Sequence, residues 1–244
     1  MHRRFASTIR LLAMTGAAFW TFHAYAQDVT PPRVLSVDEL DRHLIKVQAP
    51  ERIGPGLYRI GDISLNRTDL SISFPAVVNM DKGLLEYVLV RQGGKTHESL
   101  LRTTIEPYNL QIACLLLGME GTGKPLGFQG DPRVPGGDSV DIVLQYNDVD
   151  GKQAAVKPEQ WVVQTAGETR QDAPPGKWVY TGSMVRNGRF AAQVSGSIAA
   201  IYHDPMAMYD NAAPGGENDK IWFVKEEAVP PVGTPVTVTI RVKR

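Results

Sequence analysis

The most regular feature of the chain is an alternation of apolar and polar residues with a period of two. It is clearest near the C-terminus, where Val236, Val238, Ile240 and Val242 alternate with polar neighbours. Alternation of this kind is typical of a strand that buries one face of a sheet. The same reading predicts further strands over residues 63–65, 70–74, 84–91, 97–104, 140–146, 160–164, 178–185, 189–194 and 197–202.

A first helix is expected near the N-terminus. Ser36 and Glu39 have the spacing of a capping box, in which each side chain bonds the backbone N–H of the other's residue. Apolar residues then recur at helical spacing. The pattern predicts a short helix over 37–47.

A second helix is expected in the middle of the chain. Pro107 and Gly118 bracket an almost wholly apolar run, and these two residues favour the start and the end of a helix. A helix that is apolar nearly all round is buried on most of its faces. Cys114 lies in this run, so we expect a buried and unreactive thiol.

Many strands with two helices predict an α+β fold. We expect mainly antiparallel β structure, one buried helix at about 107–117 and a short N-terminal helix. The expected organisation has three parts: a signal peptide over 1–26, a tail with the short helix over 27–57, and a single β-rich domain over 58–244.

The first 26 residues have the pattern of an export signal. A basic start without acidic residues precedes an apolar run from Leu11 to Phe22, and Ala24-Tyr25-Ala26 has the small-x-small pattern of a cleavage site. The apolar run is too short to span a bilayer, and no later stretch is longer. The sequence therefore predicts a periplasmic or secreted protein, without a membrane span, after cleavage near Ala26.

Charge and cysteine content exclude some classes of function. Three of the 26 basic residues and none of the 26 acidic residues lie in the signal, which leaves 23 against 26 and a net charge of about −3. No basic surface for nucleic acid is expected. Cys114 is the only cysteine, so no internal disulfide forms and an iron–sulfur cluster lacks its ligands. We expect no cofactor, and the sequence leaves the metal content open.

The stretch around Gly93-Gly94 carries the candidate chemistry. Two glycines between the predicted strands 84–91 and 97–104 predict a two-residue hairpin loop. In that antiparallel register Glu86, His97 and Ser99 share one face of the sheet, and Glu98 points to the other.

The candidate polar site is therefore Glu86, His97, Glu98 and Ser99. A carboxylate, an imidazole and a hydroxyl on one face are the components of acid–base chemistry or of a partial metal site, with His97 and Glu86 as weak candidates for ligands. The alternative is a hydrogen-bonded network that only holds the fold. The His203-Asp204 pair is a weaker candidate for joining this site.

Five blocks of the sequence belong together: Gly83 to Val90, Gly94 to Leu101, Leu110 to Gly118, Trp178 to Ser183, and Gly196-Ser197-Ile198 leading to Asp204-Pro205. These blocks resemble the YdjY-domain family of bacterial exported proteins. The resemblance runs from about Tyr58 to Val242, and its Glu-Tyr and His-Glu-Ser blocks are the most specific. It implies an exported domain with no established reaction. Some relatives carry a ferredoxin-type label with an iron–sulfur cluster, from which this chain departs by its single cysteine.

Taken together, these patterns favour a periplasmic ligand-binding or interaction module with a polar hairpin site. Its partner would be a small molecule or an envelope protein. The alternative is a hydrolytic or metal-assisted enzyme that uses Glu86, His97 and Ser99. A site in a cleft beside the 119–138 loop would favour ligand binding or catalysis, and a site sealed in the core would favour a structural role. The sequence predicts neither the ligand, the reaction nor the oligomeric state.

Overall fold

The computed structural model describes residues 47–167 and 169–243 of the chain. All of them belong to one unit, Asp41–Arg244. The signal peptide expected over 1–26 lies outside the described residues, and so does the helix expected over 37–47 apart from its last residue. No helix in the described part of the chain is long and apolar enough to cross a membrane.

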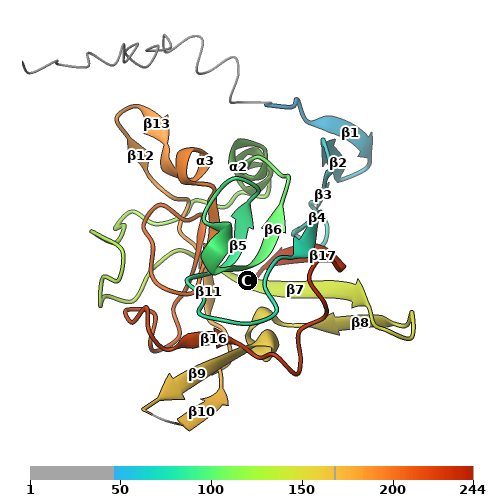
Figure 1. Ribbon diagram of the computed structural model, residues 1–244. Coiled ribbons are helices and arrows are strands. Elements are labelled where there is room, and N and C mark those ends of the chain that lie inside the picture. The colour runs from blue at the N-terminus through green and yellow to red at the C-terminus, as the bar shows by residue number, and fades with distance from the viewer. Residues whose placement is uncertain (1–46, 168, 244) are drawn as a thin grey trace, which may run out of the picture. The chain divides into compact units, whose positions relative to one another are not determined.

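Eight strands form a closed β-barrel (Figure 1). The ring closes because β6 pairs back with β4, where Val77 faces Arg102 and Val78 faces Leu101. Neighbouring strands are antiparallel except for the pairs β14–β15 and β5–β6, which are parallel. In their order around the barrel the strands are β4 (Ser71–Val78), β17 (Pro235–Val242), β7 (Asp138–Asn147), β11 (Trp178–Tyr180), β15 (Tyr209–Asn211), β14 (Ser197–Ala200), β5 (Tyr87–Arg91) and β6 (Ser99–Thr103).

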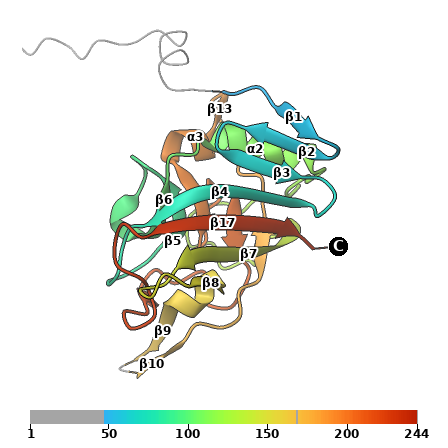
Figure 2. The same ribbon diagram turned by 90° about the vertical axis from the view of Figure 1, so that its right-hand side faces the viewer.

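Shorter elements extend and cover the barrel (Figures 1 and 2). Three strands continue the sheet outward from β4, and β8 continues it from β7. A separate three-stranded sheet and a small hairpin complete the β structure. The extending strands are β1 (Glu51–Gly54), β2 (Leu57–Ile60), β3 (Ile63–Asn66) and β8 (Gln153–Val156); the second sheet is β10 (Thr169–Asp172), β9 (Val162–Ala166) and β16 (Trp222–Val224); the hairpin is β12 (Val185–Arg186) and β13 (Arg189–Phe190). The helices are α2 (Pro107–Leu116), α3 (Ala191–Ser195) and the 3₁₀ turns η1 (Thr96–Glu98) and η2 (Pro158–Trp161).

The alternating pattern of the long strands fills the core. On β17, Val236, Val238 and Ile240 are buried while the residues between them face outward. The strands β4 and β7 alternate in the same way, and their buried residues join those of β17 in one apolar cluster. Burial of these branched and aromatic side chains is the main force that holds the barrel together.

The predicted α+β class is wrong, because the fold is mainly β and is organised by the closed barrel. The helix α2 does form, beginning at Pro107 and ending before Gly118, which has a φ of +78°. It is not the mostly buried helix that was expected: five of its ten residues are buried, and Leu115 is 58% exposed. The strand predicted over 189–194 is also wrong, since most of it forms the helix α3.

The predicted hairpin at Gly93-Gly94 is wrong as well. The strands β5 and β6 are parallel, with Tyr87 beside Ser99 and Leu89 beside Leu101. Parallel neighbours usually need a crossover of a dozen or more residues, whereas here residues 92–98 suffice. The connection runs back along β5 through η1, so the faces deduced for an antiparallel pair do not apply.

Candidate functional site

The short connection between β5 and β6 is held by a close approach of two glycines. A Cβ added to Gly196 would lie 3.0 Å from Cα of Gly94, and one added to Gly94 would lie 3.0 Å from the carbonyl oxygen of Ser195. Gly196 also has a φ of +76°, which favours glycine. The absence of side chains at both positions lets the connection turn tightly, and the Lys95 ammonium then lies over the ring of Tyr87, 4.9 Å from its centroid.

Backbone hydrogen bonds fix the start of β5 and the turn η1 against each other. The Glu86 N–H donates to the Glu98 carbonyl oxygen at 2.9 Å, and the Glu86 carbonyl oxygen accepts the N–H groups of Ile201 and Tyr202. The Asn79 side-chain amide donates to the carbonyl oxygens of residues 96 and 99 at 2.6 and 2.7 Å. Glu86 and Glu98, twelve positions apart, are therefore direct neighbours.

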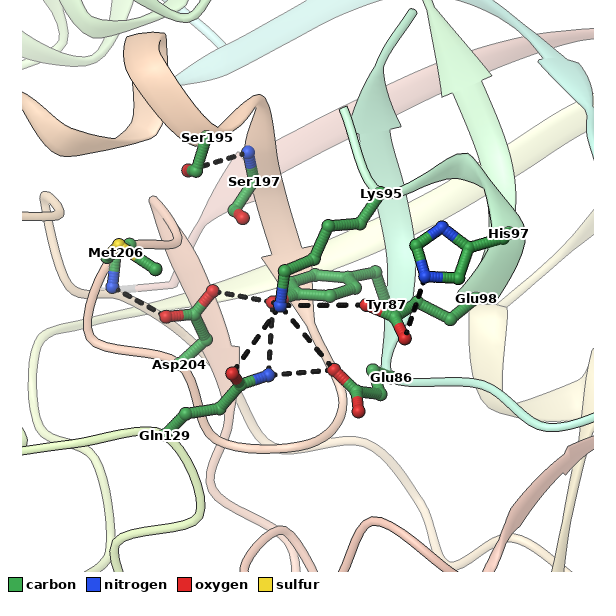
Figure 3. Close-up of polar contacts among 10 residues, drawn as sticks. All are labelled: Glu86, Tyr87, Lys95, His97, Glu98, Gln129, Ser195, Ser197, Asp204 and Met206. Atoms are coloured by element: carbon green, nitrogen blue, oxygen red, sulfur yellow. Dashed lines mark hydrogen bonds and ion pairs between the residues drawn. The ribbon is translucent and has the colours of Figure 1, made fainter. Parts of the chain in front are cut away.

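A chain of hydrogen bonds leads from the surface to a buried carboxylate (Figure 3). Lys95 Nζ donates to the Tyr87 hydroxyl at 2.8 Å, and that hydroxyl donates to Asp204 Oδ2 at 2.7 Å. Asp204 is fully buried, and its other oxygen accepts the Met206 N–H at 2.9 Å. Burial, and next the charge of Asp204, raise the pKa of Tyr87 far above its ordinary value. The phenol therefore keeps its proton and directs it to Asp204.

Gln129 joins this chain from the long loop between α2 and β7. Its side-chain amide nitrogen donates to Glu86 Oε2 at 2.7 Å, and its amide oxygen lies 3.4 Å from Lys95 Nζ. The loop is anchored beside the barrel because the Gly130 N–H donates to the His203 carbonyl oxygen. Three separate parts of the chain thus meet at Lys95.

Two carboxylates flank the Lys95 ammonium without reaching hydrogen-bond distance. Lys95 Nζ lies 3.6 Å from Glu86 Oε2 and 3.6 Å from Glu98 Oε1. All three side chains are partly exposed, at 31% for Lys95, 16% for Glu86 and 18% for Glu98. Burial, and next the charge of Glu98, raise the pKa of Glu86, while Lys95 acts in the opposite direction. Together these effects disfavour the charged form of Glu86 relative to that of an exposed glutamate.

The four residues predicted as a polar site are brought together only in part. Glu86 and Glu98 meet, although the sequence placed them on opposite faces. His97 is 78% exposed, and its Nε2 lies 3.5 Å from Glu98 Oε2 at the rim of the cluster. Ser99 is fully buried, and its hydroxyl donates to the Leu101 carbonyl oxygen at 2.8 Å. Ser99 thus makes no contact with the acid and imidazole with which it was grouped.

The weaker candidates His203 and Asp204 separate in the structure. Asp204 joins the cluster through Tyr87, whereas the ring of His203 lies between the carbonyl oxygens of Asp131 and Asn211 at 2.8 and 3.2 Å. Sequence reasoning left Tyr87, Lys95 and Gln129 out of the site. The sequence did single out the surroundings of two of them: Tyr87 lies in the Glu-Tyr block, and Lys95 lies in the polar stretch after the two glycines.

The cluster lacks the usual donor set of a metal centre. Among residues 47–167 and 169–243, no three His, Cys, Asp or Glu side chains come together in a way that would hold a metal ion. His97 and Glu86, the weak candidates for metal ligands, both lie near Glu98, with the Lys95 ammonium among them. A resident cation at Glu86 and Glu98 would have to displace that ammonium.

Comparison with known proteins agrees with the resemblance seen in the sequence. Residues 63–241 match the YdjY domain, and this segment includes every residue of the cluster. No curated protein and no solved structure matches the chain. The matched segment makes up most of the chain, which therefore belongs to the YdjY-domain family.

Proposed function

We propose that this protein is an exported ligand-binding module whose ligand contacts the cluster of Glu86, Glu98 and Lys95. The ligand would present N–H donors on a cationic group, such as an ammonium or a guanidinium. We name the three residues the carboxylate pair (Glu86 and Glu98) and its bridging lysine (Lys95).

The observation that carries this proposal is the arrangement of the carboxylate pair: Glu86 and Glu98 are partly exposed neighbours, and Lys95 approaches each of them only to 3.6 Å. Burial and the neighbouring Glu98 both disfavour the charged form of Glu86, and Lys95 offsets only part of this because it stands 3.6 Å away. Perturbed carboxyl groups of this kind are enriched at functional sites. A cationic ligand would displace the Lys95 ammonium from the two carboxylates and would donate hydrogen bonds to both of them, which stabilises their charged forms.

The geometry supports binding better than the hydrolytic alternative. Hydrolysis by the predicted residues would use Ser99 as the nucleophile, and Ser99 is buried with its hydroxyl directed to Leu101. The Tyr87 hydroxyl is committed to Asp204, and its raised pKa makes it a poor acid.

A thermal-shift screen of the protein without residues 1–26 tests the site. The probes are spermidine, arginine amide and benzylamine, with succinate and glucose as probes that lack a cation. We expect at least one amine to raise the melting temperature of the wild type, and Glu98→Gln to abolish the shift. Glu217→Gln is the matched control, because Glu217 is exposed and forms no ion pair within the described residues. An equal response of both variants would contradict the proposed site.

Export is tested separately by expressing the whole chain with a C-terminal tag. We expect the product in the periplasm or medium with Gln27 as its first residue. An uncleaved product that stays in the cytoplasm would contradict export and would leave the binding proposal to be judged by the screen.

A further inference from the structure

The outer face of three long strands forms an open polar surface. The strands β4, β17 and β7 lie side by side (Figure 2), and the residues that face outward alternate with those of the core. Cross-strand pairs place Ser73, Thr239 and Val143 in one row. Ser64 of β3 and Arg59 of β2 continue the same row. A wide face of this barrel thus carries mainly hydroxyl and other polar side chains.

Two adjoining hollows run along this face beside β17. One reaches from Thr237 to Asn147 and Gln153. The other is lined by Asp141, Val143, Gln145, Lys157, Thr239 and Arg241. Gln145 lines both hollows, and we refer to the two together as the groove.

One end of the groove carries an excess of positive charge. Asp141 Oδ1 forms an ion pair with Lys243 Nζ at 2.8 Å and a longer one with Lys157 Nζ at 3.6 Å. The hydrogen bond from Lys243 contributes most to lowering the pKa of Asp141, so this residue stays ionised. Arg241 stands directly across from Asp141 but makes no hydrogen bond or ion pair with any residue that the structure describes. Two lysines therefore pair with one carboxylate, and the guanidinium of Arg241 on the neighbouring strand is left for a ligand.

Along β17 the groove offers hydrogen bonds from side chains only. The backbone groups of β17 are paired with β4 on one side and β7 on the other, so a peptide cannot add as a strand here. The side chains of Gln145, Asn147, Gln153 and Thr237 make no hydrogen bond with other described residues. Amides and hydroxyls along an open groove suit a chain that is itself rich in hydroxyl groups.

We propose that this groove binds an acidic polysaccharide, with a carboxylate of the sugar chain on Arg241 and sugar hydroxyls on Gln145, Thr237 and the neighbouring amides. Positive charge at one end selects an anionic chain, and the row of amides and hydroxyls selects a polyol over other anions. The groove is separate from the carboxylate pair, so this inference goes beyond the proposed function and does not depend on it.

Isothermal titration with polygalacturonate oligosaccharides tests the groove, in a buffer without divalent cations. We expect binding that weakens with added salt, because the ion pair with Arg241 is exposed to solvent. Neutral galactan oligosaccharides and polyglutamate serve as the two comparison probes. Binding of polygalacturonate well above both supports the proposal. Equal binding of polyglutamate would overturn the assignment to a polysaccharide, and so would the absence of polygalacturonate binding.

Matched variants separate the groove from general charge attraction. Arg241→Met should weaken binding about tenfold, as expected for one charge-assisted contact. Gln145→Ala and Thr237→Val leave the charge of the protein unchanged and should also weaken polygalacturonate binding. Asp141→Asn removes a negative charge and should strengthen this binding. Lys220→Met is the control, because Lys220 is exposed and its ammonium has no partner among the described residues. An equal loss in Lys220→Met and Arg241→Met would overturn the proposal, and unfolding curves confirm that each variant is folded.

Binding measurements on Lys95→Met distinguish binding in the groove from binding at the carboxylate pair. We expect this variant to bind polygalacturonate as the wild type does. If Lys95→Met lost polygalacturonate binding and Arg241→Met kept it, the anion would bind at the cluster, and the proposal of a groove site would be overturned.

Discussion

The Tyr87 hydroxyl donates a 2.7 Å hydrogen bond to Asp204, a residue 117 positions later in the chain. This contact joins β5 to the segment after β14, and Lys95 closes it from the surface with a 2.8 Å hydrogen bond to the same hydroxyl. The cluster that we propose as a ligand site is therefore built on a buried polar contact.

Replacement of Tyr87 by Phe tests how much the hydrogen bond to Asp204 contributes to stability. Tyr87→Phe leaves Oδ2 of the buried Asp204 carboxylate without the phenol that donates to it, so we expect a loss of about 1–3 kcal/mol in the free energy of unfolding. Denaturant unfolding measures it. Tyr58→Phe is the control, because the Tyr58 hydroxyl makes no hydrogen bond within the described residues. Equal stabilities of Tyr87→Phe and the wild type would show that the contact contributes nothing.

The pH dependence of stability should reflect the raised pKa of Glu86. Its pKa is higher in the folded than in the unfolded chain, so its contribution is fully present below the ordinary Glu value and is lost as pH rises through the folded-state pKa. Glu86→Gln keeps a neutral side chain at every pH. We expect the free energy of unfolding of Glu86→Gln to rise relative to that of the wild type as pH rises from about 4 to 8. A difference independent of pH would mean that the pKa of Glu86 is not raised.

The two glycines at the start of the cluster give a prediction about packing. Gly196→Ala must adopt a left-handed backbone, at about 1–2 kcal/mol, and must also move the segment around Gly94. Gly151→Ala is the matched control, because Gly151 has a φ of +75° with open space around it. We expect a clearly larger loss of unfolding free energy for Gly196→Ala. Equal losses would show that the close approach is not tight.

The thiol of Cys114 should react only after unfolding. Cys114 is fully buried, its sulfur lies 2.9 Å from the Tyr209 hydroxyl, and burial raises the pKa of the thiol to about 12. An aromatic disulfide reagent should label the denatured protein and leave the native protein unlabelled over the same time. Rapid labelling of the native protein would contradict this.

The local patterns of the sequence predicted local structure well. Alternation located the long strands β4, β7 and β17, and Pro107 with Gly118 located the helix α2. The burial of Cys114 was also confirmed. Each of these features depends on residues within one element, and so it can be seen in a short window of sequence.

The closed barrel and the cluster could not be predicted in the same way. Closure depends on pairing between β4 and β6, and two glycines between apolar runs favour a hairpin by local rules. The parallel pairing of β5 and β6 depends on distant contacts, such as the approach of Gly94 to Gly196. Once that pairing is reversed, Glu86 meets Glu98 and Ser99 turns into the core.

The most direct test of the carboxylate pair is a titration of side-chain carboxyl resonances by NMR, with and without arginine amide. In the free protein we expect the pKa of Glu86 to lie above the ordinary value for Glu, and to fall in Glu98→Gln because a repelling charge is removed. Saturating arginine amide should move the Glu86 and Glu98 resonances and lower the pKa of Glu86, since a bound cation favours the carboxylate. An ordinary pKa for Glu86 that neither Glu98→Gln nor the amine changes would contradict the proposed site.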